Sequence, residues 1–340
     1  MKVKTIAFAL VAVLAAAAHA DKVTLKSGSF LTGKAGAIDG DSLEFESEDI
    51  GTVKIKVANI ARLESDREHV VRYNDLTTES KALTVADGKY MDGDRPLDMS
   101  NVKDIDAAEE KWHGAVNVAY MSSRGNTYNN NASVLANVSR RWEKDRFNAS
   151  FGYYYSETGT SKKDRETSSN RLEAEAQHDH FWTASVYHYE NARYDRDRIA
   201  GLDYRLRLGV GIGYQWLEGF NHDLTGKWSF NQELGVAWVK TGYLDEDPDA
   251  ENSYATLRYA HHLNWLPKWS PTVECFHNFE YLPDVADFDI YLMKADAGFT
   301  TKVLLDFDLL CKVEWDYDSM PSRGRKSSDV RYIVGLGYKW

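Results

Sequence analysis

Beyond residue 20 the sequence lacks any apolar run long enough for a membrane-spanning helix. Such a helix needs roughly 18 or more consecutive residues with few charges, and no later stretch of the 340-residue chain approaches that length. The chain also lacks an excess of basic residues, because 41 lysines and arginines stand against 52 aspartates and glutamates. A net charge of −11 provides no basic face for phosphates, so we expect no nucleic acid partner.

Cysteines and cofactor motifs are also scarce. Cys275 and Cys311 are the only cysteines; two are too few for a disulfide framework, and we expect both to pack as small apolar residues. The sequence contains no glycine-rich phosphate loop and no paired-cysteine metal motif. No nucleotide, iron–sulfur or other cofactor is therefore implied.

The first twenty residues have the pattern of a secretory signal peptide. Two lysines precede an apolar run at residues 6–18, and an A-x-A cleavage pattern ends at Ala20. We predict cleavage between Ala20 and Asp21. The alternative is a short membrane anchor, for which the run is too brief to span comfortably. Without the two lysines the mature chain has 39 basic and 52 acidic residues, a net charge of −13.

A sharp change of composition divides the mature chain. Residues 21–111 contain no tryptophan, whereas all ten tryptophans, 18 of the 20 tyrosines and ten of the 13 phenylalanines lie in residues 112–340. We predict two domains built for different surroundings. In residues 21–111, short β signals alternate with turns, and a weak repeat relates residues 59–63 to residues 101–105. Two packed copies of a small β unit would share one core.

From residue 112 onward, long segments alternate between apolar and polar side chains. In residues 202–216 every even position is apolar or aromatic, and the odd positions are charged, glycine or glutamine. Successive side chains of a strand point to opposite faces, so each segment has one apolar face. The segments are two to three times longer than the roughly 5–6 residues typical of strands. They suit the roughly 9–11 tilted residues that cross a bilayer.

We count twelve such segments, an even number as in bacterial outer-membrane barrels. They start near residues 112, 131, 146, 170, 181, 202, 228, 253, 272, 289, 305 and 328. Long polar connections are expected at 157–169, 191–201, 241–252 and 318–327, and short ones at 140–145, 177–180, 266–271 and 303–306. Residues 218–227 break this alternation, because a long connection falls where a short turn is expected.

These patterns predict an all-β protein: a transmembrane antiparallel β-barrel of about 12 strands, preceded by a small periplasmic β domain. In outer-membrane barrels the short turns face the periplasm and the long loops face outward. We therefore expect the outer membrane of a Gram-negative bacterium, with its lipids as partners and the N-terminal domain in the periplasm. That domain carries 13 basic and 20 acidic residues, so it should not hold anionic lipids, and its own partner, if any, has no residue-level signal.

The end of the chain carries a resemblance. Tyr338 and Trp340 close an alternating strand and resemble the aromatic signal that the barrel-assembly machinery recognises, which implies that machinery as a partner. The mature start at 21–28, the segment 122–127 and the terminal 335–338 resemble the salt-induced outer membrane protein family, whose function is unknown. The resemblance covers essentially the whole mature chain. It implies the barrel architecture and supplies no catalytic residues.

Charged residues recur at positions that the alternation assigns to the barrel interior. The candidate lumen charges are Glu173, Glu175, Asp179, Arg205, Arg207, Lys294, Asp296, Lys312, Glu314, Asp316 and Arg331. Inside a barrel such charges avoid lipid and can pair or stay hydrated. We expect a network that braces the lumen; the alternative is a polar pathway that selects ions or small solutes.

Histidines and acidic runs offer no strong metal signal. His178 and His180 share one face of a strand, while His261 and His262 point to opposite faces, and neither pair supplies the three or four ligands that a metal site needs. The acidic segment 245–251 lacks the glycine and spacing of a calcium loop. We expect a turn-end histidine pair and solvated charge rather than metal sites.

We expect a non-enzymatic outer-membrane barrel with a structural or envelope-adaptation role. A narrow channel for ions or small solutes is the alternative. A third hypothesis, a lipase-like hydrolase, needs a serine beside His188, His261 or His277, and no motif supplies that pairing.

Overall fold

The computed structural model describes most of the mature chain. The described residues are 21–39, 42–65, 68–73, 76–106, 111–124, 127–142, 144–161, 163–244, 253–270, 272–322 and 324–340. The predicted signal peptide, with Ala20, and the acidic segment 245–251 lie outside them. No helix among these residues is both long and apolar enough to cross a membrane. The chain divides into two compact units, Met1–Ala108 and Glu109–Trp340.

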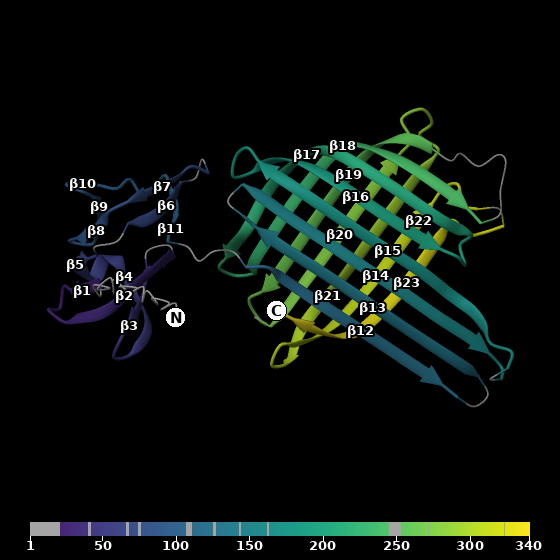
Figure 1. Ribbon diagram of the computed structural model, residues 1–340, viewed down its shortest axis with the longest axis horizontal. Helices are drawn as coiled ribbons and strands as arrows, with labels where there is room; N and C mark the ends of the chain where they lie inside the picture. The colour runs from purple at the N-terminus through teal and green to yellow at the C-terminus, as the bar shows by residue number, and fades with distance from the viewer. Residues whose placement is uncertain are drawn as a thin grey trace, which may run out of the picture. The chain divides into compact units, whose positions relative to one another are not determined.

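The N-terminal unit is a small β domain (Figure 1). Its elements are β1 (Asp21–Leu25), β2 (Phe30–Asp39), β3 (Ser42–Ser47), β4 (Gly51–Lys56), the short 3-10 helix η1 (Val57–Asn59), β5 (Ile60–Glu64), β6 (His69–Tyr73), β7 (Thr78–Lys81), β8 (Leu83–Ala86), β9 (Lys89–Asp92), β10 (Arg95–Pro96) and β11 (Val102–Ile105). Asp21, at the predicted cleavage site, begins β1, and its buried carboxylate accepts a hydrogen bond from the Ala35 backbone N–H at 2.8 Å.

The strand pairing exchanges partners between the two halves of the sequence repeat. In the first half β1 lies between β2 and β5, and in the second half β6 lies between β7 and β11. The last strand of each half then pairs with the other half, β5 with β8 and β11 with β2. Val23 and Val71, at the centres of β1 and β6, are both fully buried in one shared core. Neither half therefore has a complete core of its own.

Phe45 tests this shared core. It lies on β3 with no exposed surface, so Phe45→Ala should lower the free energy of unfolding of the N-terminal unit by about 3–5 kcal/mol. Amide hydrogen exchange of the full chain should accelerate in β1–β11 and stay unchanged in the barrel strands. Phe30→Ala is the control, because Phe30 is 61% exposed and its truncation should leave exchange unaltered.

The second unit is a closed antiparallel barrel in which strands follow sequence order (Figure 1). Its strands are β12 (His113–Ser123), β13 (Tyr128–Arg141), β14 (Asp145–Gly159), β15 (Glu166–Phe181), β16 (Val186–Asp197), β17 (Leu202–His222), β18 (Gly226–Tyr243), β19 (Ser253–Pro267), β20 (Val273–Pro283), β21 (Tyr291–Leu304), β22 (Phe307–Asp318) and β23 (Ser328–Lys339). These twelve strands of the described chain confirm the predicted fold class.

The barrel closes between its first and last strands. The β12–β23 ladder has four register pairs, from Ala115↔Lys339 to Val118↔Leu336, whereas β12 pairs with β13 along its whole length. Trp340 extends the seam, because its backbone exchanges hydrogen bonds of 3.0 and 3.2 Å with Gly114. We call this junction the seam.

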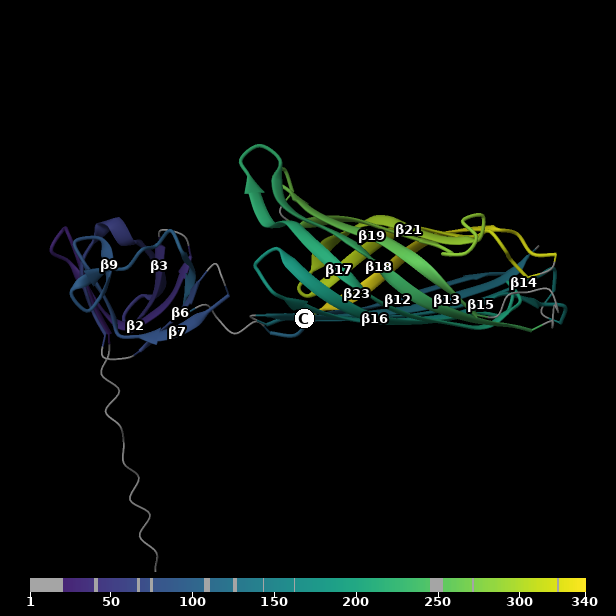
Figure 2. The ribbon, with the colours of Figure 1, turned by 90° about the horizontal axis from the view of Figure 1, so that it is seen from above.

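Three predicted connections are wrong. Residues 177–180 belong to β15, and residues 191–197 belong to β16, because their charged and amide side chains alternate between a polar lumen and the outer face instead of forming a solvated loop. Residues 218–222 and 226–227 are strand as well. There β17 and β18 run past the neighbouring turns as a hairpin (Figure 2), with residues 223–225 as its tip.

The barrel has two different ends. The connections 124–127, 160–165, 198–201, 244–252, 284–290 and 319–327 lie at one end, which we call the loop end. The connections 142–144, 182–185, 223–225, 268–272 and 305–306 lie at the other, which we call the turn end. The chain enters and leaves the barrel at the turn end, because β12 starts and β23 stops there.

Large apolar side chains cover the outside of the barrel. We call this surface the outer belt; it includes Val116, Val118, Leu208, Val210, Ile212, Leu234, Val236, Leu257, Val313, Val330, Val334 and Leu336, all exposed. Tyr338 and Trp340 face outward at the turn end with 46% and 50% of their surface exposed. Alternation puts the polar side chains between these residues inside the barrel.

Candidate functional site

The eleven predicted lumen charges lie on inward faces of five strands. Glu173, Glu175 and Asp179 are on β15, Arg205 and Arg207 on β17, Lys294 and Asp296 on β21, Lys312, Glu314 and Asp316 on β22, and Arg331 on β23. Each makes an ion pair or a hydrogen bond to a neighbour in the lumen. The structure therefore joins them into a network rather than leaving separate charges.

Glu173 is the central acceptor of this network. Its Oε2 lies 2.7 Å from Arg193 Nη2, 2.8 Å from Lys294 Nζ and 3.4 Å from Arg171 Nη2. Lys294 is on β21 and Glu173 on β15, six strands apart in a ring of twelve. This pair therefore spans the lumen from one wall to the opposite one.

A second bridge crosses the lumen at Tyr154 on β14. Its hydroxyl lies 3.1 Å from Glu173 Oε1 and 3.2 Å from Glu314 Oε1. Glu314 is on β22, where Lys312 and Arg331 pair with it at 2.5 and 2.8 Å. Tyr154 and Glu314 are buried and lie four strands apart in the ring of twelve, so the contact joins two non-adjacent parts of the wall within the interior.

Arg258 holds together the other half of the lumen. Its guanidinium lies 2.7 Å from Glu233 Oε2 and 2.7 Å from Glu280 Oε1, and it stacks over the ring of Tyr189 at 4.7 Å. The side chains of Arg258 and Glu233 are 2% and 0% exposed. Arg207 adds a contact of 2.5 Å to Glu280. Buried charges need this degree of pairing because desolvation is expensive.

Asp179 belongs to a layer nearer the turn end. It accepts hydrogen bonds from Arg146 Nε at 2.6 Å and from Gln177 Nε2 at 2.8 Å. Arg146 also donates to Gln215 at 2.9 Å, and Gln177 to Glu233 at 2.8 Å. The layer therefore continues directly into the Arg258 cluster.

Sequence reasoning missed several members of the network. They are Arg146, Arg171, Arg193, Asp195, Glu233, Arg258 and Glu280. The same inward–outward alternation would have found most of them if it had been applied to β14, β18, β19 and β20. Arg193 and Asp195 were lost because they were assigned to a loop.

Glycines on the inner wall make room for two tyrosines. A Cβ at Gly213 would overlap the ring of Tyr187, and a Cβ at Gly211 or Gly235 would overlap the hydroxyl of Tyr189. Both tyrosines are fully buried. The glycines of β17 are thus required by close side-chain packing across neighbouring strands.

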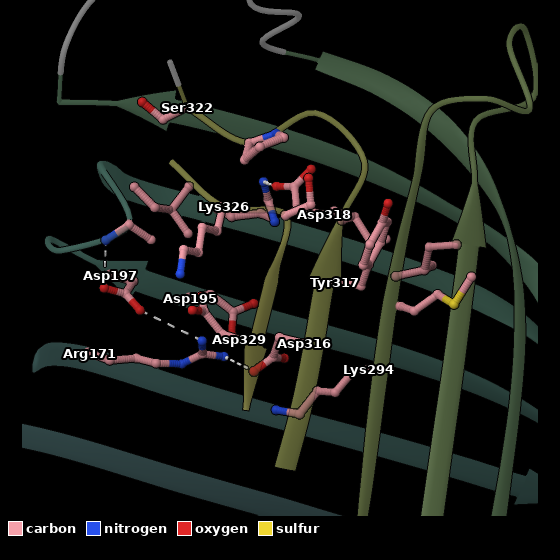
Figure 3. Close-up of a pocket in the computed structure, with 18 of the residues that line it drawn as sticks. Arg171, Asp195, Asp197, Lys294, Asp316, Tyr317, Asp318, Ser322, Lys326 and Asp329 are labelled. Atoms are coloured by element: carbon pink, nitrogen blue, oxygen red, sulfur yellow. Dashed lines mark hydrogen bonds and ion pairs between the residues drawn. The ribbon is translucent and has the colours of Figure 1, made fainter. Parts of the chain in front are cut away.

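A charged recess opens at the loop end of the lumen (Figure 3). It encloses about 90 Å³, room for a few waters or one small solute, since a water needs about 10–15 Å³ on this measure. Arg171 crosses its floor and pairs with Asp197 at 3.8 Å and Asp316 at 3.1 Å (Figure 3). Lys326, from the connection 319–327, lines the recess and forms no ion pair within the described residues.

His178, His180 and His188 lie on the outer face of the barrel. His178 Nε2 and His180 Nδ1 both contact Asp145 Oδ1, at 3.0 and 2.9 Å, and His188 lies 3.4 Å from Glu190. Across the described chain no group of three or more histidine, cysteine or acidic residues is arranged to hold a metal.

The predicted opposite facing of His261 and His262 is confirmed. His262 lies 3.8 Å from Glu233 in the lumen, and His261 contacts His277 at 3.2 Å outside. A lipase-like hydrolase needs a serine beside one of its histidines. Among the described residues, the hydrogen-bond and ion-pair partners of His188, His261 and His277 are a glutamate, a tyrosine and each other, and no serine. Cys275 and Cys311 are half-buried free thiols.

Comparison with known proteins identifies a family and similar folds. Residues 116–340 match the family described as "Protein of unknown function, DUF481". No curated protein matches the chain. Among solved structures, the translocator domain of autotransporter NalP from Neisseria meningitidis is 13% identical, with 69% of this chain and 89% of that chain covered and a TM-score of 0.35.

Two further structures are similar at the same level. For the NanC porin the identity is 12%, the coverage 67% of this chain and 100% of that chain, and the TM-score 0.38. The transport unit of the autotransporter AIDA-I from Escherichia coli is 10% identical, with 67% of this chain and 89% of that chain covered and a TM-score of 0.34.

The Arg258 cluster gives a stability prediction. Glu233→Ala leaves Arg258 buried with one carboxylate fewer, so we expect the free energy of unfolding of the barrel to fall by about 3–5 kcal/mol. Denaturant unfolding in detergent, followed by tryptophan fluorescence, measures the change. Glu218→Ala is the control: Glu218 is 46% exposed and 3.6 Å from Arg141, and its loss should cost less than about 1 kcal/mol. Equal effects of the two changes would contradict the structural role of Glu233.

Proposed function

The chain belongs to the DUF481 family, whose function is unknown, and from that starting point we propose that it is a non-enzymatic barrel of the bacterial outer membrane, with a lumen held closed by ion pairs. Its role would be to strengthen or adapt the envelope rather than to catalyse a reaction. The resemblance to salt-induced outer membrane proteins supports the adaptive part of this role.

The outer belt supports membrane insertion. Soluble monomers rarely expose contiguous apolar patches beyond a few hundred Å², whereas here side chains such as Leu234, 66% exposed, and Val210, 53% exposed, recur around the wall. The alternation of these residues with lumen charges is the pattern of a barrel surrounded by lipid. The short connections at the turn end favour the periplasm for that end, and the N-terminal domain joins the barrel there.

The cross-lumen contacts are the observation that carries the closed state. Lys294 reaches Glu173 from the opposite wall, and Tyr154 joins Glu173 on the adjacent strand to Glu314, four strands away around the ring. The interior width of a barrel grows with strand number, and small barrels are readily filled by side chains. An open pore would require these buried pairs to separate and become hydrated.

Tyr154 therefore offers a direct test of closure. In planar bilayers at high salt we expect the wild-type protein to show no conductance steps, and Tyr154→Ala to show small ones, because a central cross-lumen side chain is removed. Tyr153→Ala is the matched control, since the neighbouring residue faces the opposite side of β14 and should remain silent. Steps from the wild-type protein would overturn the closed state.

A narrow channel is the second candidate. The recess at the loop end favours it, because Lys326 and the arginines there could admit a small solute to the lumen. Steady wild-type conductance that is lost on Lys326→Ala would support this candidate in place of the first.

Membrane insertion is tested by a charge on the outer belt. Leu234→Arg should cost about 2–4 kcal/mol near the bilayer midplane and should reduce the heat-modifiable, membrane-fractionated protein. Leu224→Arg places the same change at the tip of the β17–β18 hairpin, where Leu224 is 83% exposed, and should have little effect. Recovery of the wild-type protein in the soluble periplasmic fraction would contradict the proposal itself.

A further inference from the structure

Five side chains on the outside of the barrel form one continuous hydrogen-bond chain. Trp216 Nε1 donates to Gln232 Oε1 at 2.9 Å, and Gln232 Nε2 donates to the Tyr259 hydroxyl at 2.8 Å. The Tyr259 hydroxyl lies 3.3 Å from His261 Nδ1, and His261 Nε2 lies 3.2 Å from His277 Nδ1. We call this the outer hydrogen-bond chain; it crosses β17, β18, β19 and β20.

The chemistry of the donors gives this chain a direction. An indole can only donate, so the Gln232 oxygen accepts and its amide nitrogen donates to Tyr259. The Tyr259 proton then finds its acceptor at His261 Nδ1, which places the His261 proton on Nε2, facing His277 Nδ1. His277 consequently carries its proton on Nε2. That N–H is the one donor at the end of the chain, and it has no acceptor among the described residues.

The chain lies at a defined level of the wall. Toward the loop end it is followed by aliphatic residues such as Leu234 and Leu257. Toward the turn end lie Trp228 and Trp265, whose rings stack at 5.1 Å and whose indole N–H groups bond to Thr225. Tryptophans of this kind mark the boundary between hydrocarbon and headgroups. His277 pairs with Leu263, two residues from Trp265, so the terminal N–H of the chain lies on the hydrocarbon side of this boundary, next to the headgroup layer.

The surroundings of His277 suit an anionic ligand. Its register partners, Leu263 on β19 and Ala297 on β21, are uncharged, and the His277 side chain is only partly buried. Glu280 on β20 and Asp296 on β21 have their carboxylates on the inward face. Nothing acidic on this part of the wall therefore competes with or repels a phosphate.

We propose that this wall holds the phosphate of one membrane glycerophospholipid, which accepts the hydrogen bond from His277 Nε2–H. The proposal rests on the proposed function, because the outer belt must face a bilayer. Under the proposed function this end faces the periplasm, where the membrane leaflet consists of phospholipid. The outer hydrogen-bond chain fixes the tautomer of His277 and so keeps the donor directed outward.

Native mass spectrometry of the purified full-length protein in detergent tests the site. The probe is dioleoylphosphatidylglycerol, and dioleoylglycerol, which lacks the phosphate, is the comparator. We expect His277→Leu to weaken binding of the phospholipid about tenfold, the scale of one hydrogen bond to a charged group. His277→Gln keeps an N–H donor and should stay within about threefold of the wild type. His222→Leu, at the last residue of β17, should bind as the wild type does.

Each other outcome removes the proposal. Equal phospholipid affinity of the wild type and His277→Leu excludes His277 as the donor, and an equal loss of dioleoylglycerol binding assigns the contact to an ester carbonyl. If the wild-type protein is a dimer that dissociates on His277→Leu without a change in lipid binding, then the surface around His277 binds a second copy of the chain and not a lipid. If the protein is a heat-modifiable barrel but retains no phospholipid, this inference alone is wrong. If the protein is soluble without detergent, the proposed function is wrong.

Discussion

Charge neutralisation inside a closed ring of strands is the constraint on which the rest of this barrel depends. A strand sends every second side chain inward, and a ring of twelve strands brings many inward positions within reach of one another. Arginine or glutamate there is tolerated only when a partner on another strand meets it, since an unpaired buried charge is costly. Arg258 between Glu233 and Glu280 meets this requirement most completely. The register of five or more strands is thereby linked to one interior network.

Steric fit adds a second condition to the same interior. Tyr187 and Tyr189 occupy space that exists only because β17 and β18 carry glycine opposite them. The rings of these two tyrosines, packed over glycine, fill the lumen near the turn end, and ion pairs fill it nearer the loop end. Packing and electrostatics therefore act on the same strands, and a slip of one residue in β17 would disrupt both at once.

Much of this architecture could be predicted because the strand period is so regular. Leu202–Trp216 alternates without interruption, and the predicted faces agree with the structure from Tyr204 onward. Leu202 is the exception, because the register shifts between Leu202 and Tyr204 and the Leu202 side chain is buried and lines the recess. The errors arose where the polar half of the pattern dominated. Arg193 and Asp195 read as a loop because one sequence gives no indication that their partners come from neighbouring strands: Glu173 and Glu175 pair with Arg193, and Arg207 pairs with Asp195. Pairing between Lys294 and Glu173 depends on ring closure, which no local pattern encodes.

The outer face was harder to predict for a related reason. Gln232, Tyr259 and His277 each interrupt an apolar stripe and look like isolated exceptions along their own strands. Only the lateral register brings them together, and register across four strands depends on turn lengths and on the bulges near Leu217. The division of the chain near residue 112 could be predicted without knowing the register. The surroundings of a domain affect the composition of its whole segment, so the change is visible in the sequence alone.

The seam between β12 and β23 has a consequence for how the barrel comes apart. Its ladder stops at Val118 and Leu336. Toward the loop end, each of the two strands therefore pairs with one neighbouring strand instead of two. Every other junction in the ring is paired over a longer stretch, and local opening follows the fewest backbone hydrogen bonds. Thermal fluctuation will part the wall here before anywhere else. The barrel should therefore open sideways, by separation of β12 from β23, rather than at either end of its axis.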